Sequence, residues 1–172
     1  MLRPDVISVA ALATVLVMMA GELIRSRFNE QILRRRGAIE PAGDVYRSLA
    51  WAYPAMFVAM AVEGAVAGRS SAFVTRAGIA VFCAAKLLKL WAIHTLGPRW
   101  TFRVLVPPVP EALVSSGPYA FLRHPNYVAV FGEIVGMAMV VGAPIAGAIS
   151  LIGFAVLVRK RIAVEEKALG LG

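Results

Sequence analysis

The chain of 172 residues is 59% hydrophobic and 16% charged, and its formal net charge is +8. These values, with the apolar residues gathered in long blocks, exclude an ordinary soluble domain. The positive charge does not indicate nucleic-acid binding, because the basic residues lie at the ends of apolar blocks without an interleaved aromatic face. Anionic lipid headgroups explain the charge better, so we expect a polytopic membrane protein.

Three apolar segments, residues 6–24, 48–68 and 72–96, come first along the chain. Each is close to or above the ~20 residues that a helix needs to cross the hydrocarbon core. The third segment is the most polar, because it contains Arg76, Lys86, Lys89 and His94. Ionisable side chains are costly in lipid, so we expect Lys86, Lys89 and His94, and also Glu63 and Glu133, to face protein or water.

A fourth apolar block, residues 127–158, is interrupted by Gly142, Ala143 and Pro144. A proline cannot donate a hydrogen bond inside a helix, so this block is predicted to form two helices in a tight hairpin. The fold class that follows is an all-α, polytopic integral membrane bundle of about five transmembrane helices in one domain. Three spans would remain if the hairpin only re-enters the membrane.

The two longest connections are expected to lie along the membrane surface. Residues 25–47 are polar, helical at their start, and broken by glycine and proline from Gly37 onward. Residues 97–116 mix aromatic side chains with arginines ahead of a proline-rich run, a composition that suits headgroup depth.

Most of the lysines and arginines fall on one side of a five-span topology. Residues 25–47, residues 97–126 and the tail from Arg159 carry the larger share, and the opposite side has Arg3, Arg69 and Arg76. The positive-inside rule therefore predicts that the N-terminus is outside and the C-terminus is cytoplasmic.

Polar residues concentrate at two points that this topology places in the same compartment. Arg123 and His124 supply donors suited to a carboxylate, just before Pro125, where the free amides of a helix N-terminus also favour anions. Glu165 and Glu166, near the C-terminus, supply acceptors for amines or hydroxyls. Together the two points could hold both ends of a zwitterion.

Each part of this pattern also has a purely structural interpretation. Arg123 could reach a lipid phosphate while His124 caps a neighbouring carbonyl. The Glu165-Glu166 pair could be solvated and neutralised along its helix by Arg161 and Lys167.

Glu133 follows Tyr127 by less than two helical turns and could line a cavity open to the cytoplasm. Its alternative is an ion pair with Lys86 or Lys89.

Several other chemistries are excluded by missing motifs. The chain has two histidines and no His-Glu-x-x-His spacing, and Cys83 is its single cysteine, so we expect no metal site and no disulfide. A Gly-x-Ser-x-Gly elbow, a phosphate-binding Gly-x-x-x-x-Gly-Lys loop and a Gly-x-Gly-x-x-Gly turn are absent. We therefore expect no Rossmann domain.

Two separated motifs carry a family resemblance. Residues 117–127 read Gly-Pro-Tyr, then Arg-His-Pro-Asn-Tyr, and after the hairpin come Arg-Ile at 161–162, Glu-Glu at 165–166 and Leu169. In this order they resemble the isoprenylcysteine carboxyl methyltransferase family of membrane enzymes. The family usually has glycine where this chain has Ala129. The resemblance covers residues 89 to the end, and its upstream part, similar to a small bacterial branch, is Trp91-Ala92-Ile93, Leu96-Gly97 and Trp100-Thr101.

The resemblance implies that S-adenosylmethionine is the methyl donor, bound on the cytoplasmic side by residues 97–172, while residues 1–96 supply three spans and a basic loop. Arg123 would orient an acceptor oxygen or the cofactor carboxylate, and it is an expected catalytic residue together with Glu165 and Glu166. The sulfonium would rest against aromatic faces such as that of Trp91. The implied cofactor contacts are Gly117, Tyr119, His124, Pro125, Tyr127, Arg161, Glu165 and Glu166.

The resemblance also implies a lipophilic acceptor that arrives from the bilayer. In the best-known members it is the carboxylate of a prenylated cysteine, whereas the small branch is associated with O-methylation of alkylpyrones and alkylresorcinol-derived quinones. A related subgroup methylates phospholipid amines, which is the alternative. We expect an oxygen of a long-chain molecule in a bacterial inner membrane. The residues expected to contact it, on the third and fourth spans, are Leu90, Trp91, Ile93, Val130, Glu133 and Ile134.

We predict that no dedicated base exists, because an acidic oxygen held by Arg123 as its anion needs no proton removed. Otherwise Glu165, Glu166 or Glu133 would act as the base. The non-enzymatic alternative is a small membrane scaffold or transporter subunit, in which the intramembrane charges serve assembly or ion passage.

Overall fold

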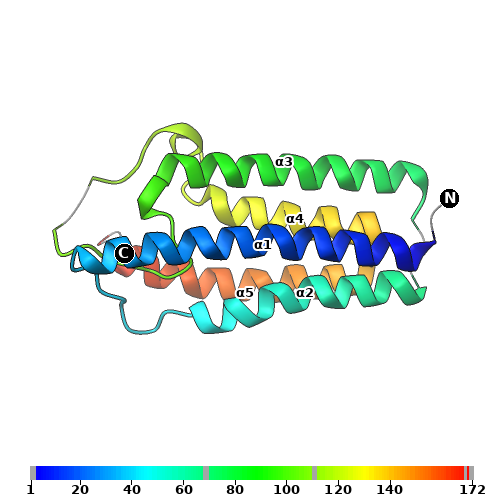
Figure 1. The fold of residues 1–172 in the computed structure, drawn as a ribbon, viewed down its shortest axis with the longest axis horizontal. Helices are drawn as coiled ribbons and strands as arrows, with labels where there is room; N and C mark the ends of the chain where they lie inside the picture. The colour runs from blue at the N-terminus through cyan, green and yellow to red at the C-terminus, as the bar shows by residue number, and fades with distance from the viewer. Residues whose placement is uncertain (1–2, 68–69, 110–111, 169, 171–172) are drawn as a thin grey trace.

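The computed structural model describes residues 3–67, 70–109, 112–168 and 170, and five long helices lie side by side in them (Figure 1). Three helical stretches are long and apolar enough to cross a membrane: Pro4–Arg35, Tyr46–Ala67 and Ala72–Arg99. The helix Pro125–Val141 is apolar but shorter. The predicted all-α membrane bundle is confirmed. The elements are α1 (Pro4–Arg35), α2 (Tyr46–Ala67), α3 (Ala72–Leu96), η1 (Gly97–Arg99), η2 (Gly117–Ala120), α4 (Pro125–Val141) and α5 (Pro144–Ala168).

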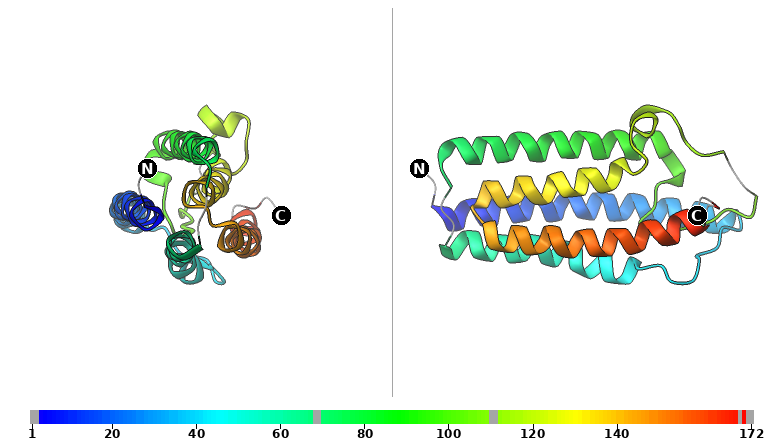
Figure 2. Two further views of the ribbon diagram at one scale, coloured as in Figure 1. Left: turned by 90° about the vertical axis from the view of Figure 1, so that its right-hand side faces the viewer. Right: turned by 180° about the vertical axis from the view of Figure 1, so that it is seen from behind.

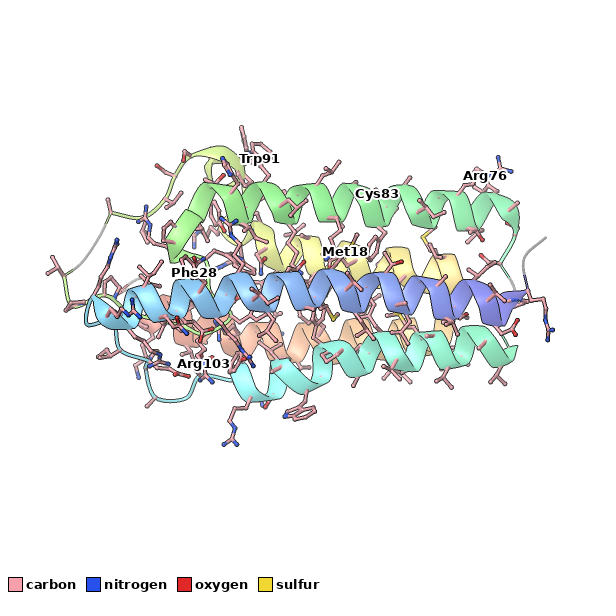
Figure 3. The ribbon with its side chains drawn as sticks, viewed as in Figure 1. Met18, Phe28, Arg76, Cys83, Trp91 and Arg103 are labelled. Carbon is pink, nitrogen blue, oxygen red and sulfur yellow. The ribbon has the colours of Figure 1, made fainter. Side chains whose placement is uncertain are left out.

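The two ends of the chain lie at opposite ends of the bundle (Figure 1). Figure 3 shows Arg76 at one end and Arg103 toward the other. Gly68, the predicted end of the second span, and Arg69 lie outside the described residues.

The first helix is longer than the predicted span of residues 6–24. It continues to Arg35 because nothing breaks it before Gly37, whose φ of 85° is the left-handed conformation that ends many helices. The expected surface connection therefore begins as a continuation of the membrane helix.

The added turns of α1 hold the connection that follows α3. Ser26 Oγ accepts a hydrogen bond from the Phe102 amide at 2.8 Å, and Asn29 Nδ2 donates to the Trp100 carbonyl at 2.7 Å. One antiparallel bridge between Ile39 and Val106 then pairs the two long connections with each other. These contacts fix the end of the bundle at which the predicted site residues lie.

The predicted hairpin is confirmed between α4 and α5. Gly142 ends α4 with φ 71° and ψ 46°, and Pro144 is the first residue of α5, where a proline costs no hydrogen bond. Glu63 of α2 accepts hydrogen bonds from the Ile145 amide at 3.1 Å and from the Ala146 amide at 2.5 Å. The half-buried Glu63 carboxylate therefore satisfies two of the free amides at the α5 N-terminus.

The helix α4 occupies the centre of the bundle and contacts each of the other four long helices (Figure 2). Its most extensive contact is with α3, because glycines let the two backbones approach closely. A Cβ atom added to Gly136 would lie 2.7 Å from the Phe82 amide nitrogen, and one added to Gly132 would lie 2.8 Å from the Ala85 Cβ.

The charges inside the third helix are paired with acidic residues of α1 and α4. Lys86 Nζ lies 2.7 Å from Glu22 and 2.9 Å from Glu133, and Lys89 Nζ lies 2.7 Å from Glu22 and 3.4 Å from Glu133. The Tyr53 hydroxyl of α2 donates a hydrogen bond to Glu133. We call Glu22, Lys86, Lys89 and Glu133 the membrane charge network, and it joins α1, α3 and α4.

This packing corrects part of the expected acceptor contact surface. Glu133 is 0% exposed and ion-paired with Lys86 and Lys89, as its alternative interpretation has it. Val130 and Ile134 are 5% and 0% exposed and belong to the hydrophobic core beside the close α3–α4 contact, so neither side chain faces lipid in this structure.

The close approach of α3 and α4 gives a direct test. Gly136→Ala should lower the free energy of unfolding by roughly 1–3 kcal/mol, since the new methyl group would meet backbone atoms that cannot move aside. Gly153→Ala on α5 is the matched control, because its Cβ would meet only the Met56 Cε at an ordinary 3.6 Å. Denaturation in detergent followed by circular dichroism measures both, and equal stability of the two variants would contradict the packing described.

Candidate active site

The loop that begins at Gly117 packs closely against the end of α3. Gly117 starts η2 with φ 57°, and a Cβ there would lie 2.5 Å from Thr95 Oγ1 and 3.1 Å from Trp91 Nε1. Only glycine combines this conformation with this closeness. Figure 3 shows Trp91 at the end of α3 where this loop passes.

The tail meets the start of α4. The Tyr127 hydroxyl donates a hydrogen bond to Glu165 Oε2 at 2.9 Å, and His124 Nε2 lies 3.5 Å from Glu166 Oε1. The His124 and Tyr127 rings lie 5.5 Å apart, tilted by 32°. Two successive carboxylates of α5 therefore face two aromatic side chains at the start of α4, His124 at its N-cap and Tyr127 in its first turn, as the shared compartment of the two motifs predicts.

Tyr119 of η2 belongs to the same cluster. Burial, and then the negative charge of Glu165, raise the pKa of the Tyr119 phenol well above its ordinary value. The phenol consequently stays protonated and neutral across the physiological range. We call Tyr119, His124, Tyr127, Glu165 and Glu166 the tail cluster.

Arg161 has a different partner from the one expected. Its guanidinium is 5% exposed, forms an ion pair with Asp44, and donates to the Phe102 carbonyl at 2.8 Å. The ion pair that Arg161 forms within the described residues is thus with Asp44 on the connection after α1 and not with Glu165 or Glu166 of its own helix. Its Nε is buried and has no hydrogen-bond partner among the residues that the structure describes.

Asp44, which the sequence analysis missed, organises the connections around the tail. Besides Arg161 it accepts hydrogen bonds from the amides of Tyr46 and Val104, each at 3.0 Å. The Asp44 carboxylate thus holds three segments together: the last part of α5, the connection after α1 and the connection after α3.

A second unpredicted group of charges supports the same connections. Arg103 lies 2.7 Å from Glu40 and stacks 4.1 Å from the centre of the Tyr46 ring, and Arg34 also lies 2.7 Å from Glu40. Burial alone would raise the pKa of Glu40, but the hydrogen bonds from Arg34 and Arg103 outweigh it and lower that pKa.

Arg123 is not part of the tail cluster. It is exposed, one residue before His124, and within the described ranges it has no hydrogen bond or ion pair. Pro125 is buried as the first residue of α4. Among the predicted site residues, the structure brings together those of the tail cluster and leaves Arg123 free at its edge.

The bundle and the tail cluster define a helical membrane protein with a polar site at one end of its spans. The chain belongs to the isoprenylcysteine carboxyl methyltransferase (ICMT) family, whose model matches residues 78–170, and these are membrane methyltransferases. It is also 31% identical to the uncharacterized protein YpbQ of Bacillus subtilis (strain 168), over 92% of this chain and 94% of the relative. No solved structure matches it.

The Asp44–Arg161 pair predicts a large loss of stability when one of the two side chains is truncated. Asp44→Ala should destabilise the protein by about 3–5 kcal/mol, because it leaves the Arg161 guanidinium buried without its counter-charge. Asp5→Ala removes an exposed pair with Arg3 and should change stability by about 1 kcal/mol or less. Hydrogen exchange of residues 97–106 and 158–168 would report the loss, and unchanged protection there in Asp44→Ala would refute this role.

Proposed function

We propose that this protein transfers a methyl group from S-adenosylmethionine to an oxygen of a lipophilic acceptor. The proposal is supported by the family match and by one observation in particular, the meeting of Glu165 and Glu166 with Tyr127 and His124. These side chains come from motifs about forty residues apart, at the ends of two different helices.

The tail cluster and its neighbours fit the chemistry of S-adenosylmethionine. The carboxylates of Glu165 and Glu166 suit its ammonium group and ribose hydroxyls. The buried Nε of Arg161 is a donor without a partner in the described part of the chain, as a site for an acceptor group requires. The absence of a side chain at Gly117 keeps the η2 backbone close to Thr95 and Trp91 at the end of α3.

Bound S-adenosylmethionine would supply an electrophilic methyl carbon on a positively charged sulfur, and that sulfur would leave as a neutral thioether when the acceptor oxygen takes the methyl group. The protein mainly has to hold the reactants in line and exclude water. The neutral Tyr119 ring favours a cation beside it without adding a competing charge, and the Tyr127 ring offers a second aromatic face. Asp44, by holding Arg161, positions the last turns of α5 and with them Glu165.

Arg123 is our candidate for holding the acceptor oxygen or the cofactor carboxylate. Its guanidinium is exposed and unpaired within the described residues, next to the N-terminus of α4. An acidic oxygen held there as its anion requires no base, which suits a carboxylate, a hydroxypyrone or an acidic phenol. A long-chain acceptor of the alkylpyrone or alkylresorcinol type is the one we favour.

We further propose that the tail cluster faces the cytoplasm of a bacterial inner membrane and that the N-terminus faces outward. The end of the bundle with the tail cluster carries Arg34, Arg103 and Arg161, whereas Arg76 lies at the other end (Figure 3). This distribution follows the positive-inside rule.

Binding of S-adenosylmethionine tests the proposed function, and removal of the tail tests whether the tail cluster is the cofactor site. Isothermal titration in lipid nanodiscs should show binding by the intact chain and none by a chain truncated after Arg161, which keeps the Asp44 pair but loses both carboxylates. Lys160→Gln, an exposed change on the same helix, is the matched control. Equal affinity of the truncated and intact chains would contradict the tail cluster as the cofactor site.

Substitution of Arg123 tests its role. Arg123→Lys should lower kcat/KM by about tenfold or more, because a point charge cannot replace a planar, bidentate guanidinium. For a phenolic acceptor, part of the loss should be recovered at higher pH, where the acceptor ionises without help. Full activity of Arg123→Lys, combined with loss of turnover but not of cofactor binding in Glu165→Gln or Glu166→Gln, would replace this mechanism by carboxylate base catalysis.

The chemical nature of the product separates O-methylation from N-methylation. Mass spectrometry of the lipid product should show a methyl ester or ether. A methylated phospholipid amine would instead place this protein with the amine methyltransferases.

A further inference from the structure

A cavity of about 540 Å³ lies between α1 and α3. The end-on view of Figure 2 shows these two helices on the flank of the bundle away from α5. Within the described residues they have little direct packing, since α1 contacts α2, α4 and η1 instead. The lining residues are Met18, Gly21, Glu22 and Arg25 of α1, and Lys86, Leu90, Ile93 and His94 of α3.

Long side chains, rather than close helix packing, join the two walls of this cavity. Lys86 and Lys89 of α3 each reach Glu22 of α1 with an N–O distance of 2.7 Å. Met18 and Leu90, on the lipid side of these pairs, are exposed apolar side chains. A void at the side of a membrane bundle forfeits dispersion contacts that an acyl chain can supply, so we expect this cavity to fill from the bilayer.

The cavity has a positive end at the depth of the lipid headgroups. The helices α1 and α3 run in the same direction, and Arg25 and His94 line the cavity toward the end of the bundle that carries the tail cluster (Figure 1). Arg25 directly follows the apolar segment 6–24, and His94 is in the last turn of α3. Met18 lies about 10 Å deeper along the axis of α1 than Arg25.

The charges deeper in the cavity do not compensate this positive end. The membrane charge network balances itself, and both carboxylate oxygens of Glu22 already lie beside lysines. Arg25 is exposed and has no hydrogen bond or ion pair within the described ranges. A guanidinium close to an imidazole N–H offers donors that suit a phosphate.

From this geometry we infer that the cavity between α1 and α3 holds an anionic phospholipid from the leaflet beside the tail cluster. Its phosphate lies between Arg25 and His94, and one acyl chain runs past Gly21 and Leu90 toward Met18. Basic pockets between membrane helices are a recurring form of anionic lipid site. The lipid is bound and not consumed, so this inference does not depend on the proposed function.

The bound lipid supplies the packing that α1 and α3 lack. Its chain covers the side of the Lys86–Glu22 pair that faces the cavity. Leu90 and Ile93, which the family resemblance assigned to the methyl acceptor, contact this lipid instead.

The methyl acceptor is the competing occupant of the cavity. It has to reach the methyl donor, but none of the residues that line this cavity belongs to the tail cluster. Arg123, at the edge of the tail cluster, remains the candidate for the acceptor oxygen. The phospholipid is therefore the occupant to which we commit.

Native mass spectrometry of the full chain in detergent, with added phosphatidylglycerol or phosphatidylcholine of equal chain length, tests the headgroup site. The wild type should retain one phosphatidylglycerol in preference to phosphatidylcholine. Arg25→Gln should lower this preference by about tenfold, because it removes the charged donor to the phosphate. Arg25→Lys should keep most of the preference. Arg27→Gln, an exposed change on the same helix outside the cavity, is the matched control.

Filling the cavity from α1 tests the path of the acyl chain. A Cβ on Gly21 would meet no atom within 4 Å, and leucine favours a helix more than glycine does, so Gly21→Leu should fold normally. Its side chain should lower the affinity for phosphatidylglycerol by about tenfold. Ala20→Leu, at the neighbouring exposed position outside the cavity, should match the wild type.

Three results would overturn the inference. Equal retention of the two lipids by the wild type, or an equal loss in Arg25→Gln and Arg27→Gln, would leave only a general attraction to surface charge. Displacement of phosphatidylglycerol by the same concentration of its soluble headgroup, glycerophosphoglycerol, would indicate an anion site without a chain groove. Displacement by a long-chain alkyl hydroxypyrone whose KM rises in Gly21→Leu would assign the cavity to the methyl acceptor.

Discussion

The membrane charge network is the constraint on which the arrangement of this bundle depends. Two lysines of α3 and two glutamates, Glu22 of α1 and Glu133 of α4, lie between helices in a chain built to sit in lipid. None of these groups can be left without its counter-charge, because an isolated charge in a low-dielectric interior costs several kcal/mol. The network therefore fixes the rotation of three helices about their axes, and Tyr53 adds α2 to it through Glu133.

The central helix α4 links the two regions that we interpret functionally. Tyr127 in its first turn donates a hydrogen bond to Glu165 of the tail. Glu133 in its middle pairs with Lys86 in the membrane charge network. The glycine contacts with α3 hold both at fixed depth. On one side α5 supplies carboxylates, and on another α1 and α3 leave a cavity. Asp44 and Arg161 then fasten the connections, so that the tail cannot swing away without exposing a buried ion pair.

The hairpin and the meeting of the two motifs were predictable because both depend on signals in the sequence: a proline after glycine, and a charge placement that predicts the same side of the membrane for both motifs. The Asp44–Arg161 pair was not, since the partners lie 117 residues apart and no local pattern connects them. Helix neighbours were equally out of reach, because hydrophobic periodicity shows which residues are apolar but not which helix each one faces. One available signal was overlooked: Gly132 and Gly136 have the Gly-x-x-x-Gly spacing of close helix pairs, which argues against an opening between α3 and α4.

Photochemical cross-linking of radiolabelled S-adenosylmethionine to the intact protein in nanodiscs tests the central claim most directly, because it reports where the methyl donor sits without depending on the acceptor. Peptide mapping should place the label within residues 112–127 or 162–168, the segments that carry the tail cluster. Label confined to residues 3–67, or a label that excess unlabelled S-adenosylmethionine fails to displace, would contradict the account.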